Sequence, residues 1–421
     1  MIITMKKTVI ELFAGVGGFR VGLNDITKIG KDGKAVEKGP WSFVWANQWE
    51  PSTKAQHAFD CYNTRFPSSN ENSNVDISKV DKALIPDHTL LTGGFPCQDY
   101  SVAHSLKGEK GIEGKKGVLW WQINDILTAK KPAFILLENV DRLVKSPAKQ
   151  RGRDFGIMLR CLSEQGYAME WRIINAADYG HPQRRRRIYI FAYHKRTHYY
   201  EINKSLKPFE ILQKNGLFAK EFPVEPFEEK SVKEYNFKKG YKDLVDVSDK
   251  FHAPFENAGY MIGDTVYTVK TKPIETKPIP LNKIVERDGV DSHYYLNDSQ
   301  RKKYEFLRGS KKIPRKDKNG FEYLYSEGAM SPYDDLSLPA RTMLTSEGTT
   351  NRSTHIIIDP KEKRLRILTP VECERINQFP DNWTDSGMPE KRRYFMMGNA
   401  LVCGIIKRIG KHINIIIDGE Q

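Results

Sequence analysis

The chain has 421 residues, 39% of them hydrophobic and 29% charged, so it holds enough apolar material for a large globular core. Its 67 basic and 53 acidic residues give a formal charge of +14, which favours a polyanionic partner because basic side chains release counterions from phosphates. No apolar run approaches the roughly 20 residues of a membrane-spanning helix, and five scattered cysteines without a CxxC pair argue against disulfides or a zinc site. We therefore expect a cytoplasmic protein with no membrane segment and no metal.

The first 195 residues alternate short apolar runs with helical stretches, which is typical of a parallel sheet covered by helices. The predicted strands are Lys7–Phe13, Ser42–Ala46, Leu90–Thr92, Ala133–Leu137, Ala168–Asn175 and Arg187–Ala192. We therefore expect an α/β fold whose larger domain is a Rossmann-like, doubly wound sheet.

A glycine-rich segment, FAGVGGF at residues 13–19, directly follows the first predicted strand. Glycines at a strand-to-helix turn let the backbone approach a ligand closely and leave amide N–H groups open. The segment is neither a full GxGxxG nor a Walker motif, so alone it fits a structural tight turn equally well. In a doubly wound sheet, Gln48 and Trp49 after the second strand, and Asp76 and Ile77 after a third, would add ligand contacts.

Two further segments follow predicted strands and carry reactive side chains. Cys97 lies in GGFPCQDYS and could project from a strand end as a thiolate nucleophile, although an isolated cysteine is more often a buried structural residue. Glu138 lies in LLENV, where partial burial would raise its pKa, although by itself such a glutamate more often caps the next helix. The polar, Gly/Lys-rich stretch 101–117 suits a mobile cover over a site.

Four consecutive arginines in QRRRR, residues 183–187, lead directly into the last of these predicted strands. Such a run is usually a solvated face. Within a strand, however, alternate side chains point to opposite sides, so Gln183, Arg185 and Arg187 would share one face.

The composition of the sequence changes at about residue 196. From there to about residue 345, Lys, Tyr, Phe, Asn and Pro are frequent and the periodicity of apolar residues is weak. We interpret this stretch as a separate domain with many loops. Helical patterns return with a capping box at 369–372, a predicted helix over Cys373–Gln378, and a second from Ala400 to about His412. The expected division is 1–195, 196–369 and 370–421.

Taken in order, six segments resemble the motifs of the cytosine-C5 DNA methyltransferase family, in particular its bacterial restriction–modification members. They are FAGVGGF (13–19), PCQ (96–98), ENV (138–140), QRRRR (183–187), RILTPVECERINQFPDNW (366–383) and GNAL (398–401). The resemblance spans about residues 8–193 and 341–410, leaving the middle region unassigned. It implies a smaller, irregular target-recognition domain in 196–369 and a C-terminal helix that returns to the catalytic domain.

The resemblance also implies how the chemistry proceeds. Cys97 would attack carbon 6 of cytosine, while Glu138 would hold N3 and the exocyclic amine. Arg187 would bind O2, and Arg185 would hold the base or the surroundings of the nucleophile. The cytosine would first have to be flipped out of the duplex.

The implied cofactor is S-adenosyl-L-methionine, and the implied substrate is double-stranded DNA. The expected cofactor contacts are Phe13, Ala14, Gly15, Gly17, Gly18, Gln48, Trp49, Asp76, Ile77, Pro96, Leu119, Asn399 and Ala400. The expected substrate contacts are Gln98, Ser101, Asn139, Val140 and Gln183. The chain departs from the family at Gln48, where many members have a glutamate for the ribose hydroxyls; Glu50 is a less certain substitute.

Three alternatives stay open at this level. A related branch of the family methylates tRNA, but the long middle region favours DNA. A catalytically inactive DNA-binding relative is disfavoured by the joint presence of Cys97, Glu138, Arg185 and Arg187. A nicotinamide oxidoreductase rests on the glycine turn alone. We expect a monomer, with a restriction endonuclease for the same site as a candidate partner.

Overall fold

The computed structural model describes residues 5–51, 53–66, 72–95, 119–317 and 320–420. Four of the predicted site residues, Pro96, Cys97, Gln98 and Ser101, lie outside this part of the chain. So does all of the predicted cover, residues 101–117.

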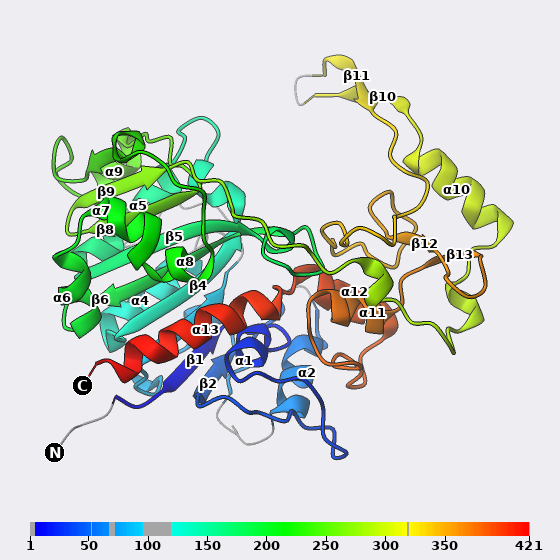
Figure 1. Cartoon of the computed structure of the whole chain (residues 1–421), viewed down its shortest axis with the longest axis horizontal. Helices are drawn as coiled ribbons and strands as arrows, with labels where there is room; N and C mark the ends of the chain where they lie inside the picture. Colours follow the sequence, from blue (N-terminus) through cyan, green and yellow to red (C-terminus); the bar gives the residue numbers. More distant parts are fainter. Residues whose placement is uncertain (1–4, 52, 67–71, 96–118, 318–319, 421) are drawn as a thin grey trace.

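A nine-stranded sheet forms the body of the molecule, with strand order β2-β1-β3-β4-β6-β5-β8-β9-β7 (Figure 1). Its strands are β1 (Thr8–Leu12), β2 (Ser42–Asn47), β3 (Leu90–Gly94), β4 (Phe134–Val140), β5 (Tyr167–Asn175), β6 (Arg186–His194), β7 (Lys233–Asn236), β8 (Ala258–Ile262) and β9 (Thr265–Val269). All six predicted strands are therefore confirmed, with ends shifted by a few residues. β1 to β4 pair in parallel, whereas every pairing from β4–β6 outward is antiparallel.

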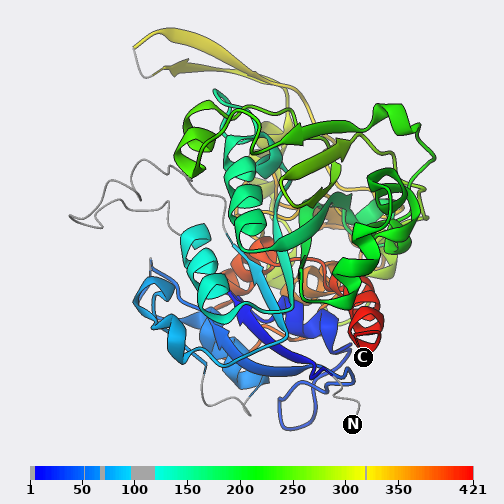
Figure 2. The ribbon, with the colours of Figure 1, turned by 90° about the vertical axis from the view of Figure 1, so that its left-hand side faces the viewer.

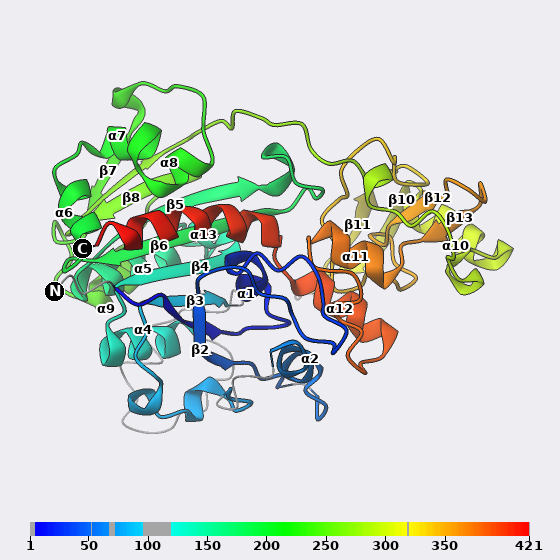
Figure 3. The same ribbon diagram turned by 60° about the horizontal axis from the view of Figure 1, so that its bottom comes forward.

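Helices cover both faces of this sheet, as a doubly wound fold requires (Figure 3). The helices are α1 (Gly18–Leu23), α2 (His57–Arg65), α4 (Leu119–Lys130), α5 (Arg153–Glu164), α6 (His198–Lys204), α7 (Pro208–Glu210), α8 (Leu217–Glu221), α9 (Leu244–Lys250), α10 (Asp298–Arg308), α11 (Pro370–Ile376), α12 (Glu390–Asn399) and α13 (Cys403–Asp418). Phe134 and Leu136 of β4 pack in the core that includes α1 and α13, whereas Ile135 and Leu137 pack in the core that includes α4 and α5. This alternation gives each strand two buried faces, which is why β4 is almost continuously apolar.

The boundary expected after residue 195 does not coincide with the edge of the sheet. The strands β7–β9 extend the sheet, and α6–α8 pack on it, although all of them lie within the stretch interpreted as a separate domain. The strands β7–β9 are short and of mixed composition, so the alternation of apolar and polar residues that would predict them is not evident in the sequence. The part that stands apart from the sheet body begins near Leu281; we call residues 281–369 the outer region (Figure 1).

The outer region contains α10 and two small antiparallel pairs, β10–β11 (Lys311–Lys316 with Glu322–Glu327) and β12–β13 (Ile356–Ile358 with Leu365–Ile367). It leads into α11, where the predicted capping box is confirmed: Thr369 Oγ1 accepts from Glu372 N at 3.2 Å, and Glu372 Oε2 accepts from Thr369 N at 2.8 Å. The box starts the helix at Pro370, as these capping residues predict, and the helix ends at Ile376, two residues before the predicted end at Gln378.

The C-terminal helix α13 returns to the sheet body and lies against α1. A Cβ added to Gly22 would lie 2.6 Å from Cβ of Ile406, so a glycine is needed for the two helices to approach this closely. The helix begins at Cys403 and reaches Asp418, later and longer than predicted, and α12 before it was missed. Within the described residues, none of the helices is both long and apolar enough to cross a membrane.

Candidate active site

Glu138 and Arg187 form an ion pair where β4 ends and β6 begins. The Arg187 Nε atom lies 3.0 Å from Glu138 Oε1, and both side chains keep a small exposed fraction, 17% for the arginine and 13% for the glutamate. Burial raises the pKa of the Glu138 carboxyl, while the charges of Arg187 and Arg185 counteract that rise. The pair is therefore largely shielded from water but accessible from one side. This environment suits a carboxyl that forms hydrogen bonds with a ligand.

The end of β3 lies directly beside this pair. The Asn139 Nδ2 atom donates to the carbonyl of Phe95 at 2.8 Å, and Asn139 is buried. A Cβ added to Gly94 would lie 3.4 Å from Glu138 Oε2, so glycine leaves this edge of the carboxylate open. The chain that enters residue 96 is thus fixed next to Glu138. Val140, a predicted substrate contact, is half-buried opposite Arg187 in the β4–β6 register.

Arg185 is buried and is bound to backbone rather than to a carboxylate. Its Nη1 and Nη2 atoms donate to the carbonyls of Met343 at 3.0 Å and Gly398 at 2.9 Å. Burial and the neighbouring Arg187 lower the pKa of its guanidinium to about 9. These contacts connect the segment just before β6 with both the outer region and the end of α12. Such an arrangement is typical of a positioning residue.

Gln183 is fully buried, and its Nε2 atom lies 3.3 Å from Asn377 Oδ1. Gln183 and Arg185 precede β6, which begins at Arg186, yet burial alternates as the sequence predicts, with Gln183 and Arg185 buried and Arg187 intermediate. The four-arginine run therefore divides into two exposed side chains, Arg184 and Arg186, and two inward ones.

The glycines of the turn after β1 lie in two different environments. Phe13 and Gly15 both have positive φ, 54° and 56°, and a Cβ added to Gly15 would meet nothing within 4 Å. At Gly17, with φ of 88°, an added Cβ would lie 2.7 Å from the ring of Phe66. Gly15 therefore faces open space, whereas Gly17 is required by close packing. Ala14 and Gly18 are buried beside them.

Gln48 is the polar side chain that meets this open glycine. Its Oε1 atom accepts from Gly15 N at 2.7 Å. Glu50, by contrast, pairs with Arg392 and caps the first turn of α2 through Ala58 N at 3.0 Å. Of the two residues considered for the ribose, Gln48 lies at the turn and Glu50 is engaged elsewhere.

The remaining predicted cofactor residues differ in exposure. Trp49 is 39% exposed, Asp76 caps a short 3₁₀ helix through Ser78 N at 3.0 Å, and Ile77 is buried. Asn47 Nδ2 donates to the carbonyl of Val75 at 2.9 Å, which brings Asp76 near the end of β2. Leu119 and Ala400 are half-buried, and Asn399 is exposed.

Glu11 is a residue of this site that the sequence reasoning missed. It is fully buried below the glycine turn, where Oε1 accepts from Phe19 N and Oε2 from the Tyr62 hydroxyl, both at 3.2 Å. Burial raises the pKa of its carboxyl to about 8, against the lowering effect of Arg20. The signal was available, because a single glutamate interrupts the apolar strand TVIEL.

A family model described as "C-5 cytosine-specific DNA methylase" matches residues 7–414. The chain belongs to this family. It is accordingly a DNA methyltransferase that modifies carbon 5 of cytosine.

Curated relatives agree with this membership. The chain is 50% identical over 413 residues to Type II methyltransferase M.Sau3AI of Staphylococcus aureus, covering 98% of this chain and 96% of that protein. It is 31% identical over 202 residues to Type II methyltransferase M.HhaI of Haemophilus parahaemolyticus, covering 48% of this chain and 53% of that one. The first match runs through the outer region as well as the sheet body.

Solved structures share the fold of this methyltransferase at low identity. The crystal structure of a DNMT2 variant from Spodoptera frugiperda superposes with a TM-score of 0.58 at 14% identity, covering 97% of this chain and 99% of that one. The methyltransferase EhMeth of Entamoeba histolytica gives 0.57 at 16% identity and covers 99% of both chains. These likenesses support the predicted α/β fold class.

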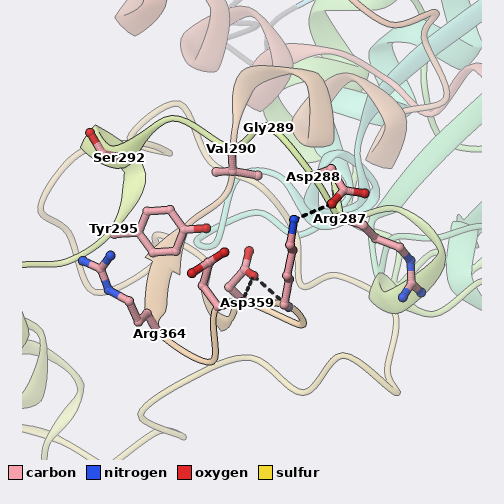
Figure 4. A pocket seen from close by; sticks show the side chains of 10 residues that line it. Arg287, Asp288, Gly289, Val290, Ser292, Tyr295, Asp359 and Arg364 are labelled. Atoms are coloured by element: carbon pink, nitrogen blue, oxygen red, sulfur yellow. Dashed lines mark hydrogen bonds and ion pairs between the residues drawn. The ribbon is translucent and has the colours of Figure 1, made fainter.

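Two cavities of the methyltransferase lie away from the Glu138–Arg187 pair. One, of about 150 Å³, is in the outer region and mixes three acidic with three basic side chains around Tyr295 (Figure 4). The other, of about 390 Å³, lies where β5 ends and β6 begins, and Lys145, Arg151, Arg186, Lys270 and Lys272 contribute to its lining. Because these five side chains are basic, the second cavity is the better match for a polyanion.

Proposed function

We propose that this methyltransferase transfers the methyl group of S-adenosylmethionine to a cytosine flipped out of double-stranded DNA, with Cys97 as the nucleophile. The observation that carries the proposal is the Glu138–Arg187 ion pair beside the strand end that leads into Pro96-Cys97. A carboxyl, a guanidinium and a cysteine nucleophile are the groups needed to activate a pyrimidine ring, and in the sequence Cys97 follows this strand end by two residues.

The reaction needs activation because carbon 5 of cytosine is a poor nucleophile. The Cys97 thiolate forms a bond to carbon 6, and the ring electrons move toward N3, where the protonated Glu138 carboxyl donates its hydrogen. Arg187 binds O2 and holds the base in the plane of the carboxyl. After carbon 5 has been methylated, a base removes its proton, the carbon 5–carbon 6 double bond re-forms, and the thiolate leaves.

The other cysteines support Cys97 as the nucleophile. Cys61, Cys161, Cys373 and Cys403 are all buried. Burial raises the pKa of Cys61 to about 11 and that of Cys161 to about 12, so their thiolates are scarce at neutral pH.

The glycine turn fits the methionine and ribose parts of S-adenosylmethionine. The open space at Gly15, the positive φ of Phe13 and the amide of Gln48 form a polar cradle that a Cβ at Gly15 would begin to fill. The bound cofactor supplies a methyl group on a positively charged sulfur. Asp76 and Ile77 would contact its adenine, and Asn399 and Ala400 would close the site from the C-terminal segment.

Positive charge around the larger cavity supports a DNA substrate. Lys145, Arg151 and Lys270 line this cavity and form no ion pairs within the described residues. We infer that they bind phosphates of the duplex, from which the target cytosine must be flipped to reach the buried pair.

The similarity to the Staphylococcus aureus enzyme extends over the outer region, so we propose that the two enzymes recognise the same short DNA sequence. We further propose a cytoplasmic monomer that protects host DNA from an endonuclease with this specificity. Mapping methylated cytosines after treating one genomic DNA with each enzyme tests the shared specificity, and two different sets of sites would refute it.

The decisive experiment compares the wild type with Cys97→Ala on unmethylated genomic DNA and S-adenosylmethionine, with methylation mapped at single-base resolution. We expect methylation at one recurring short sequence with the wild type and none with the variant. A duplex with 5-fluorocytosine at the target should trap a covalent complex with the wild type only, because fluorine cannot leave as the proton does. Equal cofactor affinity and melting temperature in the two proteins exclude misfolding, whereas methylation by the variant would sink the proposed nucleophile.

A further inference from the structure

The β10–β11 hairpin projects from the outer region with neither face covered (Figures 1 and 2). Within the described chain its two strands pair only with each other, from Lys311 opposite Glu327 to Lys316 opposite Glu322. Phe321, Tyr323 and Leu324 are 69%, 42% and 62% exposed. A bare two-stranded hairpin is marginal in water, and exposed large apolar side chains in one place mark a contact surface.

The charges of this hairpin favour an anionic partner. Glu322 and Glu327 are both in ion pairs, with Lys316 at 2.8 Å and Lys311 at 3.2 Å. Lys312 and Arg315 form no ion pair with any described residue, so the positive charge is left uncompensated. The Arg315 guanidinium lies 3.9 Å from the centre of the Tyr325 ring, which holds it extended on the same face as Tyr323.

The base of the hairpin is firmly attached. Lys311 Nζ donates to the carbonyl of Leu307 at 2.6 Å, at the C-terminal end of α10. Glu327 also pairs with Arg352 at 2.9 Å, so both strands are tied to the outer region. A ribbon fixed at its base and free along its length can be inserted into a partner without reorganising the fold.

Pro314 in β10 argues against a second copy of the chain as the partner. It has no N–H, so the free edge of β10 cannot offer a full row of donors to another strand. A symmetric pairing of two hairpins would also bring Lys312 and Arg315 near their own copies.

We propose that the β10–β11 hairpin enters the major groove of the DNA beside the target cytosine and reads base edges there. The major groove, about 12 Å wide, admits a two-stranded ribbon. Arg315 offers two parallel donors that match a guanine edge, and Tyr323 and Tyr325 flank it, while Lys312 on the other face meets phosphates. This assignment rests on the proposed DNA substrate, and it names the element of the outer region that selects the sequence.

The test replaces residues 311–327 by two glycines that join Ser310 to Gly328, and separately makes Arg315→Ala and Lys312→Ala/Tyr325→Ala. A matched control, Ile202→Ala/Lys204→Ala, removes one exposed apolar side chain and one cation from α6, away from the outer region (Figure 1). The probes are a duplex taken from a mapped methylation site and the same duplex with one base pair of the recognition sequence changed.

We expect Arg315→Ala to weaken binding to the mapped site about 10-fold and to reduce discrimination against the changed duplex. The shortened protein should lose most of its discrimination, while its affinity for S-adenosylmethionine and its melting temperature stay close to those of the wild type. Lys312→Ala/Tyr325→Ala should weaken binding to both duplexes and reduce its salt dependence, and the control should change neither.

Unchanged affinity and discrimination in the shortened protein would overturn the proposal. If the shortening instead converts a dimer to a monomer in light scattering without affecting DNA binding, the hairpin is a self-association surface. If Cys97→Ala still methylates the mapped site while these hairpin effects hold, the proposed nucleophile is refuted and the hairpin assignment stands.

Discussion

The sheet body and the outer region of this methyltransferase are held together by different interactions. In the body, apolar residues of the strands fill two cores beneath covering helices, and only a few charged residues of the described strands, such as Glu11, Glu170 and Arg172, are buried among them. In the outer region the separate apolar cluster is small, centred on Leu296, Tyr304 and Ile356, and buried charges fix the geometry.

Buried charged groups of the outer region form ionic networks, one of which reaches Glu372 of α11. Arg366 lies 2.7 Å from both Asp359 and Glu372, and all three side chains are buried. Arg308 and Arg341 share Asp334, at 2.9 Å and 2.5 Å. Ionic networks depend on direction and distance more than apolar packing does, so they can fix loops that have no regular periodicity. The comparison teaches that the body tolerates conservative change, whereas the outer region depends on individual charges.

The largest effect is expected at Glu138 in the body. Glu138→Gln keeps the size of the side chain but removes both the charge that pairs with Arg187 and the acidic proton that the carboxyl can donate toward N3. We expect kcat to fall about 10³-fold, corresponding to about 4 kcal/mol, with little change in melting temperature. Single-turnover methylation of a mapped duplex measures it. Near-normal kcat would show that the pair is structural.

The next effect tests the dependence of the outer region on single charges. Asp334→Asn should destabilise this region by about 3 kcal/mol, because two arginines lose their shared carboxylate. Limited proteolysis should then cut within residues 281–369 while the sheet body persists. Equal resistance of both regions to the protease would contradict the comparison.

The same carboxylate predicts a pH dependence. Burial alone would raise the pKa of Asp334, but hydrogen bonding from Arg341 and the charges of His355, Arg341 and Arg308 bring it below its ordinary value of 3.8. The unfolded state therefore binds more protons, so the stabilisation is complete above about pH 4 and declines as the pH falls below that value. The wild type should lose outer-region protection below pH 4, and Asp334→Asn should show a flatter profile.

Arg185 connects the two regions, so its replacement sharpens the comparison at their junction. Arg185→Lys keeps a positive charge but reaches only one of the carbonyls of Met343 and Gly398. We expect a loss of about 1–3 kcal/mol in the free energy of unfolding, because one buried acceptor is left unpaired. Denaturant unfolding measures it. A normal stability with a large loss in kcat would instead make Arg185 a catalytic residue.

The smallest effect concerns the cofactor. Gln48→Glu restores a charged acceptor beside Gly15 and should tighten binding of S-adenosylmethionine up to about 10-fold through charge-assisted hydrogen bonds. Calorimetric titration of the wild type and the variant compares them, with Glu50→Gln as the control. Tighter binding by the control instead would move the ribose contact to residue 50.

The sequence predicted the body far better than the outer region, for reasons visible in particular residues. The β4 run FILLENV is apolar on both faces and ends in Glu138, so its strand and its polar end are both evident. The β7 segment KEYN is short and polar, and only its pairing with β9 makes it a strand. The capping box of α11 was predictable because both of its bonds are local.

The candidate site was predictable where its residues lie at strand ends, and less so elsewhere. Glu138 and Arg187 were predicted from that pattern and lie together, whereas Arg185 precedes β6 and contacts backbone about 160 and 210 residues later. Glu11 was missed because the alternation of apolar and polar residues in strands does not predict a buried glutamate within an apolar strand. The predicted roles of these residues await the experiments above.

The return of the C-terminal segment to the glycine turn has a consequence for biosynthesis. Trp383 Nε1 donates to the carbonyl of Val16 at 2.8 Å across 367 residues, and Arg65 binds the carbonyls of Trp383, Asn382 and Asp385. At roughly 5–20 residues per second, a ribosome needs on the order of tens of seconds to add the partner of Val16 after making the turn. A nascent or truncated chain that ends before Trp383 therefore lacks this support for its glycine turn. In a cell that makes this enzyme, the turn is completed only in chains whose synthesis has passed Trp383.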